Sequence, residues 1–189
     1  MCRVRAYLDE SVQVGPPGLY VIAAAVVPPA AADGARHELR QVAGKTKQLH
    51  WRDESGTRRA AVIFVVAQLD VEHLVAVCTP IDPKRQERSR RHALTRLLWE
   101  LDQRDVRDVV LETRAHRDKE DRAHIASQQR AQALSRDLRY EFGQPRQEPL
   151  LWLPDVVAGA VAYARTGRDT TYLDGLGASV VVLDVEPRG

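Results

Sequence analysis

The sequence predicts a mixed α/β domain whose first strands pair antiparallel and whose later strands are joined by crossover helices. Residues 4–11 alternate apolar and polar side chains, the period-two pattern of a half-buried strand. A short Gly/Pro turn at 12–18 leads into a continuous apolar run at 19–27, which favours an antiparallel pair. Beyond this pair, strand-like and helix-like runs alternate, as crossover connections require.

The segment 30–69 reads as two helices inserted between strands. Residues 30–43 are rich in helix-forming residues and end at Gly44. Ser55 is a suitable N-cap for a second helix at 56–69. The apolar face expected for that helix consists of Ala60, Ile63, Phe64 and Ala67.

The middle of the chain predicts strand, helix and strand in turn. Residues 72–79 form an apolar run that ends at prolines, and 106–113 form another that ends near Glu112. Between them, 84–103 is the clearest helix. Its first half is basic, and its second half carries a leucine stripe of Leu94, Leu97, Leu98 and Leu101.

The last third of the chain has weaker patterns. Residues 118–137 predict a polar helix with a short core stripe of Ile125, Ala133 and Leu134. A short strand is expected at 138–142. The apolar run 150–164 becomes a helix from about Pro154, because proline suits the first helical turn. In the tail, residues 165–189, only 179–185 resembles a strand, and nothing in the sequence fixes its partner.

Composition sets the class of protein. The chain has 189 residues, 44% hydrophobic and 29% charged, which predicts one soluble domain over 1–189 with a helical insertion at about 30–69. No apolar run reaches the roughly 20 residues that span a bilayer, so we expect a cytoplasmic protein without membrane contact. The two cysteines form no zinc or disulfide motif. A net charge of +2 is too small to predict nucleic-acid binding.

Three acidic residues interrupt apolar sequence. Asp9 ends the first strand, Glu112 ends the strand at 106–113, and Asp155 is the one charged residue between 150 and 164. If those two strands lie parallel and adjacent, Asp9 and Glu112 meet at one rim of the sheet, and a final helix could bring Asp155 to them. Gathered carboxylates repel unless a cation neutralises them, and oxygen-only ligands suit Mg²⁺ or Mn²⁺.

Each of these acids also has a simpler explanation. Asp9 and Ser11 are ordinary turn residues. Asp155 could serve the positive end of a helix dipole. Glu112 could form a surface ion pair with Arg114 or Arg107. Glu10 faces away from Asp9 if the strand continues, so it is the weaker candidate ligand.

His50 and Trp51 form a second candidate pair. A positioned His50 could shuttle protons near a metal, and Trp51 could stack on a base. The alternative is a partly buried aromatic cluster, since tryptophan usually packs. Lys45, Lys47 and Arg52 surround the pair and would suit phosphate contacts.

Three motifs in order resemble the domain of unknown function 3800 family, which belongs to the ribonuclease H-like superfamily. They are Tyr-Leu-Asp-Glu-Ser at 7–11, Lys-Gln-Leu-His-Trp at 47–51 and Leu-Trp-Leu-Pro-Asp-Val-Val-Ala-Gly-Ala at 151–160. The resemblance implies an α/β fold of the ribonuclease H-like type, with a mixed five-stranded sheet of order 3-2-1-4-5 flanked by helices. It covers about 4–164 and leaves out the tail.

The resemblance also implies roles for single residues. Asp9 takes the first-strand metal position and Asp155 the last-helix position, while Glu112 stands where the superfamily usually has Asp. Pro154 replaces a small residue before the helix Asp. The second acidic ligand of the superfamily has no clear counterpart, and Glu54 is its weaker candidate.

Together these observations predict a divalent-metal-dependent nuclease that hydrolyses phosphodiester bonds of RNA or DNA. Asp9, Glu112 and Asp155 would hold Mg²⁺ or Mn²⁺, and His50 would assist as a proton shuttle. Two other hypotheses stay open. The domain could be catalytically inactive and bind nucleic acid or another protein on the same fold, or it could be a purely structural partner subunit.

Overall fold

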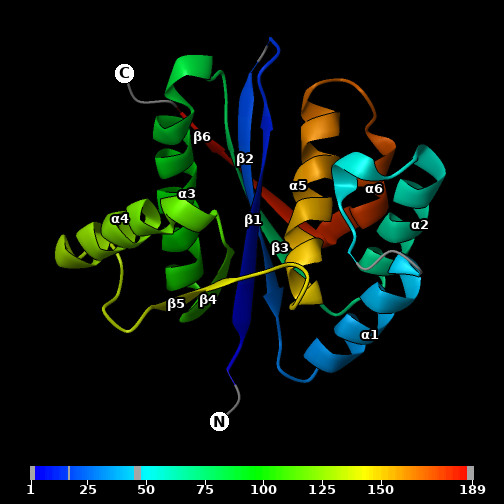
Figure 1. Cartoon of the computed structure of the whole chain (residues 1–189), viewed down its shortest axis with the longest axis horizontal. Helices are drawn as coiled ribbons and strands as arrows, with labels where there is room; N and C mark the ends of the chain where they lie inside the picture. Colours follow the sequence, from blue (N-terminus) through cyan, green and yellow to red (C-terminus); the bar gives the residue numbers. More distant parts are fainter. Residues whose placement is uncertain (1–2, 17, 45–47, 187–189) are drawn as a thin grey trace.

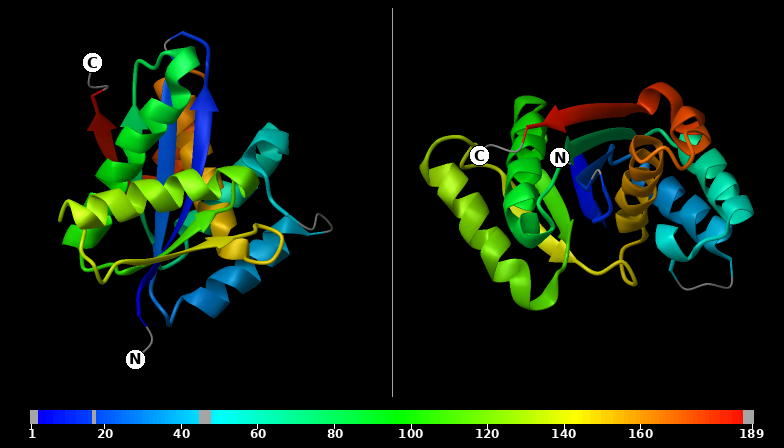
Figure 2. Two further views of the ribbon diagram at one scale, coloured as in Figure 1. Left: turned by 60° about the vertical axis from the view of Figure 1, so that its left-hand side comes forward. Right: turned by 90° about the horizontal axis from the view of Figure 1, so that it is seen from above.

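The computed structural model describes residues 3–16, 18–44 and 48–186, and its centre is one mixed sheet of six strands. The order is β5-β4-β1-β2-β3-β6, with β5 and β6 at opposite edges (Figure 2). The strands are β1 (Arg5–Gln13), β2 (Leu19–Val27), β3 (Glu72–Cys78), β4 (Asp108–Glu112), β5 (Arg139–Gly143) and β6 (Val180–Val185). β2 pairs antiparallel with β1 and with β3, whereas the β1–β4, β4–β5 and β3–β6 pairs are parallel.

Helices cover both faces of this sheet. They are α1 (Ala32–Ala43), α2 (Gly56–Ala67), α3 (Gln86–Gln103), α4 (Asp118–Arg130), α5 (Trp152–Arg165) and α6 (Thr171–Leu176). α3 and α4 lie on one face, and α1, α2, α5 and α6 lie on the other (Figure 1). The fold is therefore a three-layer α/β arrangement with a ribonuclease H-like strand order.

The alternation of β1 divides its side chains between two cores. Tyr7 belongs to the core under α5, whereas Ala6 and Leu8 belong to the core under α3. All nine residues of β2 are buried, because both of its faces are covered. This explains why β2 reads as a continuous apolar run while β1 alternates.

The tail holds the main departure from the predicted topology. The predicted order 3-2-1-4-5 is present, but β6 adds a sixth strand beside β3, and α6 precedes it. β6 borders only one strand and is partly exposed, so its apolar pattern alone could not identify that neighbour.

Several helix details also differ from the sequence-based expectations. On α2 the buried side chains are Val62, Ile63 and Val66. Ile63 of the predicted apolar face is confirmed, whereas the prediction was wrong for Ala60, which is exposed, and for Phe64, which is 69% exposed. α4 ends at Arg130 rather than near 137.

Beyond α4, Leu134 is buried but Ala133 is exposed. α5 starts at Trp152, because a 3-10 turn that begins at Pro149 leads into it two residues before Pro154. The predicted N-cap Ser55 is confirmed, since its hydroxyl accepts from the Arg58 backbone N–H at 3.4 Å.

Trp51 fixes the segment between α1 and α2 onto α5. Its ring is 5% exposed and makes edge-on contacts with Tyr163 and Tyr172 at centroid distances of 5.5 and 5.1 Å. The ring lies directly over Gly159, where a Cβ atom would come within 2.2 Å of it. Arg59 also packs on the ring, with its guanidinium 5.2 Å from the Trp51 ring centroid.

In the described part of the chain, every helix is too short or too polar to cross a membrane.

We predict that Gly159→Ala lowers the free energy of unfolding by about 1–3 kcal/mol, because the added methyl must displace the Trp51 ring. Chemical denaturation followed by circular dichroism measures this. The matched control is Gly34→Ala in α1, where no atom lies within 4 Å of the added Cβ. That variant should keep or slightly raise stability. Equal stability of both variants would contradict the packing described for Trp51.

Candidate metal centre

Asp9 and Glu112 are brought together by the parallel pairing of β1 and β4. Leu8 lies opposite Leu111 in the register, so Asp9 and Glu112 are the next residues along the two strands. Both side chains lie on the α5 face, because Tyr7 and Val110, two positions earlier, contribute to the core on that face. The prediction that these strands lie adjacent and parallel is confirmed.

The two carboxyl groups share an electrostatically strained environment. Burial, followed by the charges of Glu112 and Asp155, holds the pKa of Asp9 well above its ordinary value. Burial and the charge of Asp155 also raise the pKa of Glu112, while a hydrogen bond with the Asp9 side chain opposes that rise. Without a cation, the pair therefore favours a state in which Asp9 carries a proton and donates it to Glu112.

Asp155 lies in the first turn of α5 and ties the Trp51 segment to the site. Its Oδ2 atom accepts from the Trp51 backbone N–H at 2.8 Å and lies 3.1 Å from Nδ1 of His50. The hydrogen bond to Asp155 raises the pKa of His50. The contact also assigns the proton of a neutral imidazole to Nδ1, which leaves Nε2 as the basic nitrogen.

The surface ion pairs considered for Glu112 are not the arrangement seen. Within the described residues, Arg114 pairs with Glu87 at 2.6 Å and with Asp121 at 3.2 Å. Arg107 pairs with Asp102 and Asp105. Both arginines are thus engaged away from Glu112, and its charge is left facing Asp9 and Asp155.

A pocket of about 230 Å³ opens between β1 and β4 beside these carboxylates. Asp9, Glu112 and His50 line it from the α5 side, and Arg90 and Arg114 line it from the α3 and α4 side. In the sheet, β1 is followed by β2 toward one edge, and β4 is followed by β5 toward the other edge. The chain therefore changes direction across the sheet between β1 and β4, where the pocket lies. Open α/β sheets bind their ligands at such switch points.

Glu10 and Glu54, the weaker candidate ligands, each form an ion pair with an arginine. Glu10 points to the α3 face, as predicted. There it accepts from Nε of Arg90 at 2.6 Å, although it still lines the pocket. Glu54 pairs with Arg58 one helical turn away at 3.1 Å and lies outside the pocket lining. Glu54 is therefore not a counterpart of the missing ligand.

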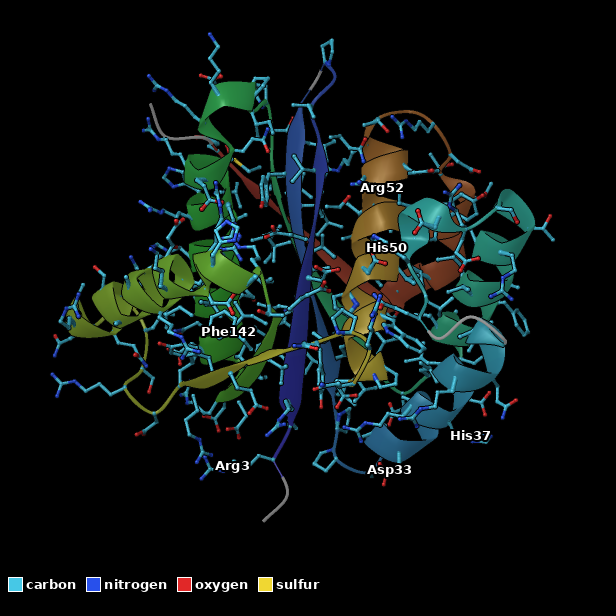
Figure 3. All side chains as sticks on the ribbon, in the orientation of Figure 1. Arg3, Asp33, His37, His50, Arg52 and Phe142 are labelled. Carbon is cyan, nitrogen blue, oxygen red and sulfur yellow. The ribbon has the colours of Figure 1, made fainter. Side chains whose placement is uncertain are left out.

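The expected nucleic-acid contacts need one correction. Trp51 is buried under α5 and cannot stack on a base, because Gly159 gives its ring room to pack inward instead. Arg52 is exposed and lies near His50 on the α5 side of the sheet (Figure 3). Lys45 and Lys47 lie outside the described residues.

Arg90 is a residue of the site that the sequence pattern did not indicate. It falls in the basic first half of α3, which reads as a solvated face, yet it is 4% exposed and pairs with both Glu10 and Asp121. Its position one turn before Leu94, in line with the leucine stripe, is the signal that points it inward.

The donor set fits a hard divalent cation by its chemistry. Asp9, Glu112 and Asp155 offer only oxygen atoms, and the raised pKa of two of them shows that their charges lack compensation. As they stand, however, no three His, Cys, Asp or Glu side chains in 3–16, 18–44 and 48–186 form a ready ligand sphere. Binding would therefore have to displace the proton that Asp9 and Glu112 share.

We predict that Asp9→Asn stabilises the metal-free protein increasingly as pH rises. The folded-state pKa of Asp9 lies above its ordinary value of 3.8, so stability is greatest below that value and is lost as pH rises through the raised pKa. The neutral amide removes this loss. In EDTA, thermal denaturation from about pH 4 to pH 8 should show a gain in stability that grows with pH.

The control for this experiment is Asp108→Asn at the opposite end of β4, whose carboxylate pairs with Arg139. A difference between Asp9→Asn and wild type that does not change with pH would contradict the coupled carboxyl pair.

Comparison with known proteins supports the fold and leaves the family open. No protein-family model matches the sequence, and no curated protein matches it. Among solved structures, the chain is similar to ribonuclease HII in the PCNA:RNase HII complex from Archaeoglobus fulgidus, with a TM-score of 0.57 and 14% sequence identity. The alignment covers 94% of this chain and 82% of that chain. At this identity the likeness shows the architecture alone, and the chain has a ribonuclease H-like fold.

Proposed function

We propose that this protein is a divalent-metal-dependent nuclease that hydrolyses phosphodiester bonds of RNA or DNA. The observation that carries the proposal is the half-buried pair of Asp9 and Glu112, electrostatically coupled to Asp155, at the switch point of a ribonuclease H-like sheet. The sequence resemblance to the domain of unknown function 3800 family supports it, and we propose membership of that family.

The three carboxylates would hold the ion. The other residues would position the phosphates of the substrate and transfer protons to or from them. Asp9 and Glu112 would be the primary ligands and Asp155 the third. A bound Mg²⁺ or Mn²⁺ would supply a Lewis acid and an activated water. Asp155 keeps the proton of His50 on Nδ1, so Nε2 can take up or release a proton at the scissile phosphate. Exposed Arg52, with Lys45 and Lys47 before it in the chain, would hold phosphates of the substrate.

A catalytically inactive domain that binds nucleic acid or protein is the second candidate. Two observations favour it: the described residues form no ready ligand sphere, and Glu112 replaces the Asp usual in the superfamily. In that case the carboxyl pair would stay protonated and the pocket would bind its partner without reaction. Metal binding and cleavage separate the two candidates.

We predict that Mn²⁺ binds the wild-type protein and that Asp9→Asn weakens this binding at least about tenfold, since one charged oxygen ligand is lost. Isothermal titration calorimetry at neutral pH measures this, and because binding releases protons, the observed heat should change with the ionisation enthalpy of the buffer. Asp108→Asn is the control and should bind as wild type does. Absence of binding at millimolar Mn²⁺ would refute the metal centre.

We predict that cleavage of labelled RNA or DNA requires Mg²⁺ or Mn²⁺ and falls at least about a hundredfold in Asp9→Asn and Asp155→Asn. His50→Ala should lose less, about ten- to a hundredfold, because it removes only proton transfer. Gel assays with purified variants measure the rates. Metal binding without cleavage of either nucleic acid would favour the inactive domain instead.

A further inference from the structure

The pocket beside the carboxylates has an apolar floor that metal chemistry does not need. Leu8, Ile22, Leu94 and Leu111 form this floor, and each side chain is at most 2% exposed. They come from β1, β2, α3 and β4, so the floor is part of the rigid core rather than of a loop. A ligand that reaches the floor would therefore have to present an apolar surface.

The size of the pocket limits what can enter. Its volume is about 230 Å³. An apolar cavity of about 150 Å³ holds one benzene ring, whereas sites for larger ligands usually start near 300 Å³. The pocket therefore suits one flat ring system and is too small for two stacked nucleotides.

The charges around the pocket argue against a phosphate inside it. Arg90 is already neutralised by Glu10 and Asp121, and Arg114 by Glu87 and Asp121. Asp9 and Glu112 also line the pocket and would repel an anion. The part of a substrate that enters the apolar end of the pocket should therefore carry no negative charge.

The rim offers hydrogen bonds to the edge of such a ring. Nε of Arg114 is buried and has no hydrogen-bond partner within the described residues. A buried donor without an acceptor is costly. The Thr113 hydroxyl on the same rim is already bonded to Asp118 and to the Ala115 backbone N–H, so the polar side chains that face a ligand are those of His50, Asp9 and Glu112. Polar groups at the edge and apolar side chains at the floor together match the two surfaces of a nucleobase.

We propose that this pocket receives one unstacked base of the substrate, so that the enzyme acts on single strands or frayed strand ends rather than on continuous duplex. The inference rests on the proposed nuclease function, since it places the base next to the scissile phosphate at the carboxylates. A base within a duplex is stacked on both sides and cannot enter unless it is flipped out.

The test uses a set of fluorescein-labelled oligonucleotides with one abasic site moved along the strand. Fluorescence anisotropy with the full-length protein in Ca²⁺ buffer measures affinity. We expect one position at which loss of the base weakens binding roughly 5- to 150-fold, the usual contribution of one base contact, and little change elsewhere. The intact single strand should also bind more tightly than the same sequence as a duplex. Equal loss at every abasic position, or equal affinity for duplex, would overturn the proposal.

A protein variant tests the pocket itself. Leu94→Phe would fill the floor, and Leu97→Phe is the matched control on the same helix, buried in the same core but outside the pocket lining. Circular dichroism verifies that each variant is folded. Leu94→Phe should abolish the effect of the sensitive abasic position, and Leu97→Phe should keep it. If Leu94→Phe does not fold, the oligonucleotide series with wild-type protein decides alone.

The outcomes separate this proposal from the nuclease proposal. Mn²⁺-dependent cleavage with no position-sensitive base would overturn the base pocket and leave the nuclease standing. A position-sensitive base without cleavage in Mn²⁺ would support the pocket and refute the nuclease. No binding of any oligonucleotide would overturn the base pocket.

Discussion

The parallel pairing of β1 and β4 places two acids, Asp9 and Glu112, side by side in a half-buried position. The rest of the site is arranged around the repulsion between these carboxylates. Asp9 and Glu112 follow the last pair between β1 and β4, and each still pairs on its other side, Asp9 with Ala23 of β2 and Glu112 with Gly143 of β5. Burial and the charges of Glu112 and Asp155 raise the pKa of Asp9, and burial and the charge of Asp155 raise the pKa of Glu112. A fold selected for stability alone would place apolar residues or an ion pair there, so the acids point to a ligand that compensates their charge.

The position of Asp155 near Asp9 and Glu112 depends on the packing of Trp51 against α5. Trp51 fits against α5 only because Gly159 lacks a side chain, and the Trp51 backbone N–H then holds Asp155 Oδ2 at 2.8 Å. The same segment presents His50 to Asp155. Trp51 thus serves the site through its backbone and its bulk. The tryptophan of the motif at 47–51 is therefore explained by packing and by its backbone hydrogen bond, and not by stacking on a base.

Much of this arrangement could be predicted from sequence, where periodicity and strand ends carry the signal. The alternation of β1 and the apolar run of β2 indicate the antiparallel pair, and the acids that follow apolar residues in β1 and β4 suggest that Asp9 meets Glu112 if these strands are adjacent. The strand order came from the family resemblance instead. Other features depend on tertiary contacts that no local pattern encodes. The pairing of β6 with β3 depends on how the tail folds. Arg90 is buried only because Glu10 and Asp121 neutralise its charge.

The central claim is that the carboxyl pair is protonated without a cation and loses its proton when one binds. NMR titration of the side-chain carboxyl carbons measures this directly, with Asp9→Asn and Glu112→Gln used to assign the signals. Without metal, the Asp9 signal should titrate well above 3.8. At saturating Mg²⁺ that titration should move far to lower pH. An Asp9 pKa near its ordinary value without metal, or one that does not respond to Mg²⁺, would contradict the account.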